Sequence, residues 1–352
     1  MMKNSQPQRM VIGLIISLSL LGIHEIVLKQ HVLRDEHAEM KQASKLASKW
    51  MLLIDEHKKD LGIESDLTTT IPYERMLGSE YTPVTTTLGS LQAKELSTNP
   101  DFSALVVRFL REAGIDSTQK VGVTLSGSFP ALGVSVLAAL QVLKIDVILL
   151  SSLGASSWGA NQAGAMWIDY ENWLVQMGGL EYKSRVVTYG GENDNGSSIF
   201  PEGMTLMDST LSKYEDRVFL PESLQESIAA KTQLLMGESA DLLINIGGNQ
   251  ASLGGCSHAF DIPPGLNWDL PSCVHDNRGL ILVLSEHGIP VIQLLNIREL
   301  AIHYGIQTPY RNSHQESKLV YHDYKTDPGH TIVALIIFTG CILWIHKGRE
   351  EC

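Results

Sequence analysis

The chain reads VGVTLSGSFPALGVSVLAALQVLKIDVILL over residues 121–150. Residues 121–125 form a short apolar run typical of a buried strand, residues 132–143 favour a buried helix, and residues 146–150 form a second apolar run. A strand, a helix and a second strand of this kind indicate parallel strands whose two faces are both covered. This stretch therefore predicts an α/β fold.

The same alternation continues along the chain. Further apolar runs lie at residues 185–189, 242–246 and 289–295, with helical patterns between them. We expect a Rossmann-like, doubly wound and mostly parallel sheet of about five strands, within a globular domain over residues 77–325. Upstream of this domain, apolar residues recur at helical spacing, which predicts an amphipathic helical segment over residues 31–76.

Two charge-free apolar runs lie near the ends of the chain, at residues 10–23 and 331–345. Each is shorter than the roughly 20 residues that a bilayer requires, but flanking His, Lys and Arg side chains reach toward the headgroups. We expect an N-terminal signal anchor within residues 1–30 and a C-terminal transmembrane helix at residues 330–346. The competing interpretations are a cleaved signal peptide for the first run and a buried core helix for the second.

The charges beside these runs predict which side of a membrane the central domain faces. Lys3 and Arg9 precede the first run, and Lys347 and Arg349 follow the second. Positive flanks favour cytoplasmic tails. We therefore expect localisation at the cell membrane with an extracytoplasmic central domain.

Net charge and cysteine count narrow the class of protein. The formal net charge of -12 argues against a general electrostatic grip on nucleic acid. Four cysteines in a chain of 352 residues are too few for a disulfide framework. We expect neither a nucleic-acid partner nor a cofactor, and composition leaves homo-oligomerisation open.

Polar loops follow the predicted strands, and parallel sheets bind ligands beyond the carboxyl ends of their strands. Glycine lets backbone N–H groups approach a ligand, and a helix N-terminus favours an anion. The alternative is that these glycines only permit tight strand-to-helix turns. We predict a ligand-binding cleft that draws on Thr85, Thr86, Lys94, Ser126, Gly127, Ser128, Ser156, Ser157, Asn161, Gly191, Asn193, Gly247, Gly248 and Asn249.

The common catalytic signatures are absent. There is no P-loop and no dinucleotide-binding motif, and residues 154–158 (GASSW) lack the second glycine of a nucleophile elbow. A serine nucleophile is a second hypothesis, at Ser126 directly after the first strand. It would need a base such as His258 and an orienting acid such as Asp169.

Two C-x-H pairs flank a Pro-Pro step, Cys256 with His258 and Cys273 with His275. Four such ligands are compatible with a tetrahedral zinc site, but the usual spacing of two to four residues between cysteines is missing. A disulfide between Cys256 and Cys273 is another alternative. The interpretation that we favour is unconnected core cysteines with surface histidines, and hence no metal.

The stretch GSEYTPVTTTLG at residues 78–89 is unusual, and it continues to Ala93-Lys94 and to STNP at residues 97–100. Together with the loops SGSFP at 126–130, GASSWGAN at 154–161 and NIGGN at 245–249, it resembles the poly-γ-glutamate system protein family. The likeness covers nearly the whole chain. It implies a bacterial membrane protein of a poly-γ-glutamate synthesis or export apparatus, with the bilayer, the polymer and synthase or export subunits as partners. It implies no particular reaction and no catalytic residues.

The leading functional hypothesis is an accessory component that binds the nascent polymer or a partner subunit through the strand-end cleft. The γ-linked polymer carries one carboxylate per residue, which backbone donors beside Thr85, Thr86 and Lys94 are suited to engage. The second hypothesis is an anchored enzyme that cuts or transfers γ-glutamyl bonds with Ser126. A third is a scaffold whose glycine loops bind nothing.

Overall fold

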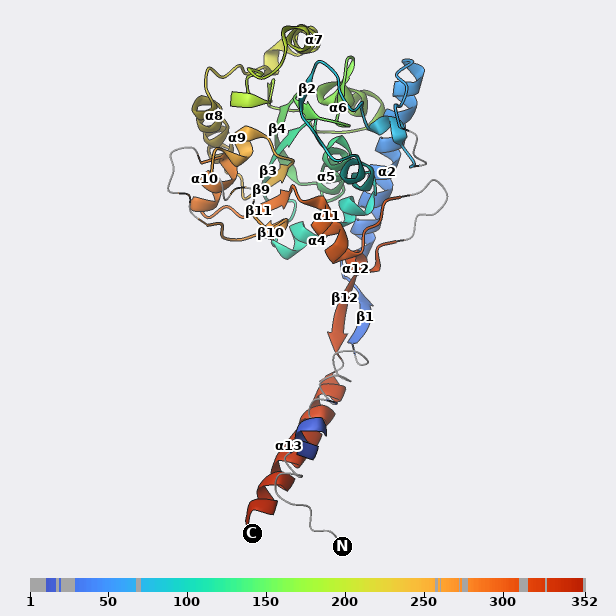
Figure 1. Cartoon of the computed structure of the whole chain (residues 1–352), viewed down its shortest axis with the longest axis vertical. Coiled ribbons are helices and arrows are strands. Elements are labelled where there is room, and N and C mark those ends of the chain that lie inside the picture. Colours follow the sequence, from blue (N-terminus) through green and yellow to red (C-terminus); the bar gives the residue numbers. More distant parts are fainter. Residues whose placement is uncertain are drawn as a thin grey trace. The chain divides into compact units, whose positions relative to one another are not determined.

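The computed structural model describes most of the chain, namely residues 11–16, 19, 29–67, 71–256, 259, 261–271, 273, 278–309, 316–326 and 328–350. The chain divides into two compact units. The larger unit is Glu36–Tyr321, and the smaller one joins Met1–Asp35 with His322–Cys352. Figure 1 shows the elements of each unit.

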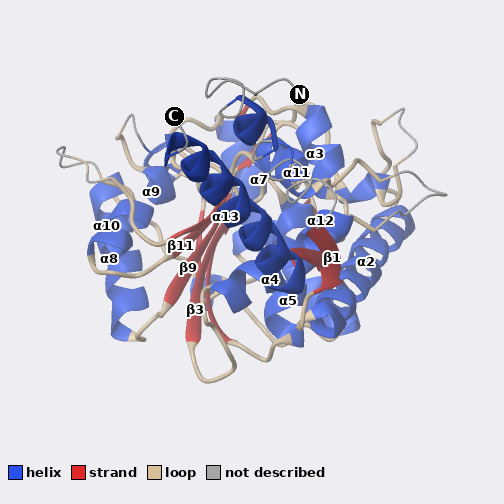
Figure 2. Cartoon of the chain, turned by 90° about the horizontal axis from the view of Figure 1, so that it is seen from below, coloured by secondary structure: helices blue, strands red, loops and turns tan. Residues whose placement is uncertain are grey.

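The larger unit is built on a six-stranded mixed sheet with the strand order β10-β11-β9-β3-β4-β8. Five neighbouring strands are parallel, and only β10 runs antiparallel to β11. Figure 2 shows the strands with helices on both sides. In chain order the six strands are β3 (Lys120–Ser126), β4 (Asp146–Ser152), β8 (Val186–Thr188), β9 (Leu242–Ile246), β10 (Gly265–Asn267) and β11 (Val291–Leu294).

Three small sheets accompany the main one. The parallel pair β2 (Thr85–Thr87) and β5 (Ala155–Ser156) and the antiparallel pair β6 (Asn161–Gln162) and β7 (Ala165–Met166) belong to the larger unit. The smaller unit holds the antiparallel pair β1 (Lys29–Leu33) and β12 (His322–Thr326).

The expectation of a single, mostly parallel sheet of about five strands is therefore corrected. The fold is α/β, but its main sheet is mixed, and the chain forms further two-stranded sheets. The sixth strand, β10, carries only three residues and follows the Pro263-Pro264 step. So short a segment has no apolar periodicity, and pairing with the edge of β11 is what makes it a strand.

Helices cover both faces of the main sheet. The central helix α5 (Pro130–Val142) is apolar all round, and residues 130–140 are all buried, as expected for a helix enclosed on every side. It packs with α2 (His37–Asp60) and α4 (Asp101–Glu112) against one face. On the other face, α8 (Leu224–Gly237) and α10 (Leu280–Glu286) share a core with β9 and β11.

Shorter elements complete the larger unit. The remaining α-helices are α3 (Leu91–Ser97), α6 (Trp167–Trp173), α7 (Pro201–Leu211), α9 (Gln250–Leu253), α11 (Ile297–Tyr304) and α12 (Lys318–Tyr321). Single tighter or wider helical turns are η1 (Glu74–Met76), η2 (Leu174–Gly178), η3 (Glu192–Asp194) and η4 (Glu215–Arg217).

The two expected membrane anchors are also corrected. Within the described part of the chain, no helix combines the length and the apolar character needed to cross a bilayer. The helix α13 (Pro328–Glu350) contains the second apolar run, residues 331–345. At 1.5 Å per residue that run measures about 22 Å, whereas the hydrocarbon core of a bilayer is about 30 Å thick. Most of the first anchor lies outside the described residues. The expected location at the cell membrane is corrected by the same finding.

Candidate functional site

A pocket of about 670 Å³ lies at the carboxyl ends of β3, β4 and β9. The segment from β2 to α3 forms another of its walls. Eight of the residues predicted from the sequence line it: Thr86, Lys94, Ser126, Ser128, Ser156, Gly191, Gly248 and Asn249. The rest of the lining is Thr87, Leu88, Gly89, Ser90, Ala93, Phe129, Ser152, Gly154, Glu192, Ser198, Gln250 and Leu295.

Lys94 is a buried charged group in the lining of this pocket. Only 1% of its surface is exposed. Its Nζ donates to the Ser156 Oγ at 2.8 Å and to the Ser128 carbonyl oxygen, and it lies 3.9 Å from the centre of the Phe129 ring. Within the described residues no carboxylate forms an ion pair with Lys94. All of its polar partners there are neutral oxygens.

Burial controls the protonation of Lys94. Removing the ammonium group from water disfavours its charged form and lowers the pKa of Lys94 from 10.5 to about 7. Near neutral pH the side chain therefore exists in both its protonated and its neutral forms. A carboxylate brought into the pocket would favour the protonated form.

The local sequence explains how Lys94 reaches this position. Ser90 caps α3, with its Oγ accepting from the Ala93 N–H at 3.4 Å, and Lys94 follows one turn later. Gly89 allows the close approach, because a Cβ there would lie 2.8 Å from the Ser157 carbonyl oxygen, 3.2 Å from the Ser156 Oγ and 3.3 Å from the Lys94 Cε.

Ser156 is held through its backbone. It pairs with Thr87 in the small parallel sheet of β2 and β5. Its N–H donates to the Ser128 Oγ at 3.1 Å. The side chain is left to face Lys94 and the pocket, and 8% of the residue is exposed. Two independent anchors thus fix the position of this hydroxyl.

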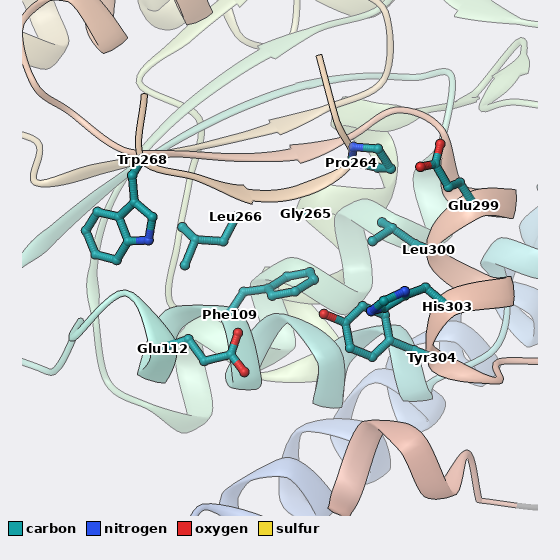
Figure 3. Close-up of a pocket in the computed structure, with 10 residues that line it drawn as sticks. All are labelled: Phe109, Glu112, Pro264, Gly265, Leu266, Trp268, Glu299, Leu300, His303 and Tyr304. Atoms are coloured by element: carbon teal, nitrogen blue, oxygen red, sulfur yellow. The ribbon is translucent and has the colours of Figure 1, made fainter. Parts of the chain in front are cut away.

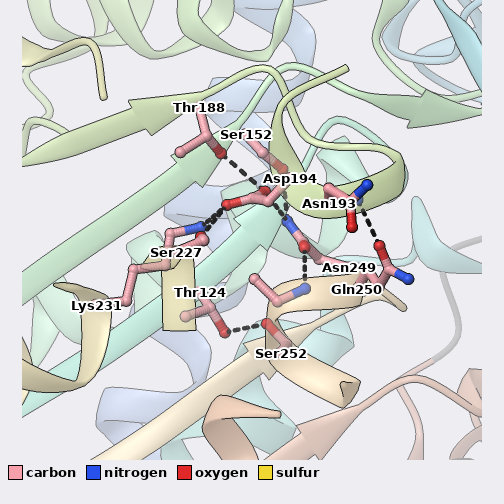
Figure 4. Close-up of polar contacts among 11 residues, drawn as sticks. Thr124, Ser152, Thr188, Asn193, Asp194, Ser227, Lys231, Asn249, Gln250 and Ser252 are labelled. Carbon is pink, nitrogen blue, oxygen red and sulfur yellow. Dashed lines mark hydrogen bonds and ion pairs between the residues drawn. The ribbon is translucent and has the colours of Figure 1, made fainter. Parts of the chain in front are cut away.

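A closed polar network ties the strand-end loops together beside the pocket (Figure 4). Asp194 is fully buried, and its carboxylate accepts from Ser227 at 2.5 Å, from Thr188 at 3.0 Å and from the Lys231 ammonium group. Asn249 donates to Asp194 at 3.3 Å and to Ser152 at 2.8 Å. The loops after β4, β8 and β9 are therefore joined by side chains.

Six predicted binding residues do not line the pocket: Thr85, Gly127, Ser157, Asn161, Asn193 and Gly247. Several of them instead hold or shape loops within the described residues. The Asn161 amide donates to the Ser79 carbonyl oxygen at 2.8 Å and to the Thr85 Oγ1 at 2.9 Å, which holds the segment before β2. Asn193 and Gly247 have φ angles of 53° and 84° and shape turns. A Cβ at Gly127 would lie 2.8 Å from the Leu153 carbonyl oxygen.

Of the catalytic group predicted around Ser126, only Ser126 and Asp169 lie within the described residues. The Ser126 Oγ accepts from the Ser128 N–H at 3.4 Å. Asp169 is buried near the start of α6, where it accepts from the Met166 N–H at 3.0 Å, and desolvation raises its pKa. It does not line the pocket, and His258 lies outside the described residues.

The two cysteines predicted to be unconnected form a disulfide, Cys256–Cys273. It closes a loop with a sequence separation of 17 residues. The loop brings the cysteines together at the edge of the α8–α10 core, a proximity that their spacing does not reveal. The zinc alternative also needed His258 and His275, which lie outside the described residues. Among the residues that are described, no cluster of ligands suits a metal ion.

A second hollow, of about 480 Å³, lies between α4, β10 and α11 (Figure 3). Phe109, Trp268 and Tyr304 give it aromatic walls, and Glu112 and Glu299 lie at its margins. Glu112 is already bonded to Arg108 at 2.8 Å, and Glu299 accepts from Asn296 at 2.9 Å. None of the predicted binding residues lines this hollow, so the strand-end pocket is the better candidate.

Sequence reasoning missed several lining residues and one pairing. Ser152, Gly154, Glu192 and Ser198 lie in the polar strand-end loops and share their composition, which is the signal that could have identified them. Phe129 carries no such signal. Lys94 and Ser156 were both expected to bind a ligand, but 62 positions separate them, and no spacing rule predicts their contact.

Comparison with known proteins adds no family to this description. No protein-family model matches the chain, and no curated protein sequence matches it.

Proposed function

We propose that this protein binds a carboxylate-bearing polymer in the strand-end pocket, and that poly-γ-glutamate, indicated by the sequence resemblance, is the ligand. The observation that supports this proposal is Lys94. Within the described residues it is a buried amine that faces an open pocket without a carboxylate partner. A buried cation is costly unless it is paired, and a ligand carboxylate would supply the missing partner.

The rest of the lining suits the backbone of such a polymer. The hydroxyls of Thr86, Ser126, Ser128 and Ser198 are donors for carboxylate and carbonyl oxygens. Glu192 is exposed in the same pocket, and its carboxylate is an acceptor for amide N–H groups. The pocket therefore offers donors and an acceptor to a chain that alternates carboxylates with amides.

The size of the pocket limits what is bound at one time. About 670 Å³ falls within the range of about 300–1,000 Å³ that is usual for small-molecule sites. We therefore propose that a short segment or a chain end occupies the pocket, while the remainder of the polymer stays in solvent.

Calorimetric titration of the full chain with γ-linked glutamate oligomers tests this proposal. Lys94→Met should weaken the affinity by about tenfold or more, the equivalent of one charge-assisted hydrogen bond. The exposed Lys183 lies outside the pocket, and Lys183→Met makes the same exchange of side chains there, so it should leave the affinity unchanged. No binding to the wild-type chain at low salt, or equal losses in the two variants, would contradict the proposal.

The pH dependence of binding provides a second test. The carboxylate interaction needs protonated Lys94, and burial lowers the pKa of this lysine to about 7. The affinity should therefore fall as the pH rises through neutrality, and binding should take up a proton. Lys94→Met should remove this dependence. An affinity that is flat between about pH 6 and pH 9 would assign the ligand to other groups.

A further inference from the structure

We propose that Ser156 and Lys94 form a nucleophile and base pair that transfers or hydrolyses γ-glutamyl acyl groups in the strand-end pocket. The choice of substrate class rests on the proposed function, whereas the pair itself rests on geometry. The Lys94 Nζ lies 2.8 Å from the Ser156 Oγ, which is within the reach required between a serine nucleophile and its base.

Both side chains are positioned before any ligand enters. Ser156 is fixed by its pairing with β2 and by the Ser128 hydroxyl that accepts its N–H. Lys94 is fixed by the capped helix α3, by the Ser128 carbonyl oxygen and by the Phe129 ring. Both residues line the same pocket, so a substrate carbonyl can approach the hydroxyl. Preorganisation of this kind is what an activated nucleophile needs.

Lys94 also has the protonation behaviour of a base. An ordinary lysine is protonated at neutral pH, but burial lowers the pKa of Lys94 to about 7, so a neutral amine is present there. The charged groups around it are Glu95 on α3, Glu192 in η3 and Arg298 of α11, whose guanidinium donates to Ser90. Burial, and not these charges, causes the lowered pKa.

The reaction balances with water as the only co-reactant. The Ser156 Oγ attacks the γ-carbonyl carbon, and its proton passes to the neutral Lys94 Nζ. The C–N bond breaks, and the leaving amine takes that proton, which leaves an ester on Ser156. Water then attacks the ester carbonyl and gives a proton to Lys94. Cleavage of the C–O bond returns the proton to Ser156 and releases the carboxylic acid. An amine in place of water completes a transfer.

Two neighbouring hydroxyls can assist the negative charge that develops on the carbonyl oxygen. The Ser126 Oγ accepts from the Ser128 N–H, and the Ser128 Oγ accepts from the Ser156 N–H. Each hydroxyl still has its own proton to donate, and both residues line the pocket. In this mechanism Ser126 stabilises charge, and the nucleophile is Ser156.

The experiment treats the full chain with a fluorophosphonate probe and follows labelling by intact-protein and peptide mass spectrometry. The wild-type chain should be labelled on Ser156, at a rate that rises with pH through neutrality. Ser156→Ala should abolish labelling, and Lys94→Met should slow it by about 100-fold, the size of a general-base contribution. The matched control is Ser157→Ala. Ser157 is the adjacent buried serine, its Oγ has no hydrogen-bond partner among the described residues, and it does not line the pocket.

Cleavage of γ-linked glutamate oligomers is measured with the same proteins. Thermal unfolding checks that each variant is folded. If Ser156→Ala does not fold, Ser156→Cys tests the same position by its pH-dependent alkylation. Three results would overturn the proposed Ser156–Lys94 pair. They are no labelling of the wild-type chain, labelling at another residue, or a labelling rate that Lys94→Met does not change.

Binding and chemistry fail separately in this design. Ser156→Ala keeps Lys94 and should still bind the oligomers. If the wild-type chain binds the oligomers but is not labelled, the catalytic pair is overturned and the proposed function stands. If it is labelled but does not bind the oligomers, the proposed function is overturned and the catalytic pair stands. The two roles of Lys94 also need opposite protonation states, so the affinity should fall with rising pH while the labelling rate rises.

Discussion

Two buried lysines near the strand ends lie in opposite surroundings. Lys231 on α8 is 4% exposed and donates to Asp194, a carboxylate that also accepts from Thr188 and Ser227. Lys94 is just as buried, but its partners within the described residues are neutral oxygens and an aromatic ring, and a pocket opens beside it. Lys231 therefore belongs to a buried ion pair, whereas Lys94 is a buried amine beside a pocket.

The difference separates a structural role from a functional one. A buried charge that is fully paired joins elements together, and here it joins the loop after β8 to helix α8. A buried amine without a carboxylate keeps the desolvation cost and stays available for a ligand or a proton. Two lysines of similar burial thus have different roles, because one has a carboxylate partner and the other does not.

Breaking the closed pair should have the largest effect on stability. Lys231→Met leaves the Asp194 carboxylate buried without its cation, and we expect the free energy of unfolding to fall by about 3–5 kcal/mol. Urea unfolding followed by circular dichroism measures this. Lys94→Met removes no such pair and relieves the desolvation cost of the buried amine, so it should leave the free energy of unfolding unchanged or raise it.

The double variant Asp194→Asn with Lys231→Met is the control for the closed pair. It removes both charges together, and it should recover part of the stability lost in Lys231→Met. A loss in Lys94→Met as large as that in Lys231→Met would remove the distinction between the two lysines.

The pH dependence of stability should distinguish the open lysine from an apolar residue. Because the pKa of Lys94 is about 7 in the folded chain and 10.5 as a free side chain, the unfolded chain binds more protons between these values. Stability should therefore rise with pH over that window and gain on the order of 2 kcal/mol by pH 9 from this residue. Below pH 7 both states are protonated and the contribution is constant.

Lys94→Met should remove that part of the rise, and chemical unfolding at several pH values shows it. Lys58 is a useful reference, because burial lowers its pKa to about 7 as well, but it donates to the Leu77 carbonyl oxygen, Gln162 and Tyr170 and does not line the pocket. Its share of the rise should persist in Lys94→Met. A wild-type curve that is flat above pH 7 would contradict the lowered pKa values.

The smallest expected effect concerns the space around the open lysine. Gly89→Ala places a Cβ against the Ser157 carbonyl oxygen, Ser156 and Lys94, and it should cost about 1 kcal/mol of stability, at the low end for overpacking. Because two of these contacts involve the proposed pair, oligomer affinity and probe labelling should fall as well. Gly237→Ala is the matched control, since a Cβ there meets nothing within 4 Å. Calorimetry and labelling of both variants test this, and equal results would show that Gly89 is not needed for the pair.

Much of the main sheet could be predicted from the sequence. The apolar runs at residues 121–125, 146–150 and 242–246 lie in β3, β4 and β9, because buried parallel strands need apolar residues on both faces. The strand β10 and the small sheet of β2 and β5 could not be predicted. Their residues are short and polar, and they become strands only through the partners that the fold supplies.

The candidate site, like the sheet, could be predicted from the sequence only in part. Strand-end position identified Ser126, Ser128 and Gly248, because the carboxyl ends of parallel strands meet at one edge. It also selected Asn193 and Asn161, whose amides donate to Ser197 and to the Ser79 carbonyl oxygen, since composition does not tell a donor aimed at a ligand from one aimed at the protein itself. The Cys256–Cys273 disulfide escaped prediction for a related reason, because contact between distant residues is decided by the path of the chain.

The sequence by itself determined that this is an α/β protein with polar loops at its strand ends, because periodicity and turn chemistry are local properties. Only the tertiary structure decided which polar residues meet. In the folded chain Lys231 forms an ion pair with Asp194, whereas Lys94 contacts Ser156 and lines a pocket. The physical reason is that the energy of a buried charge depends on the groups around it, and those groups come from distant parts of the chain.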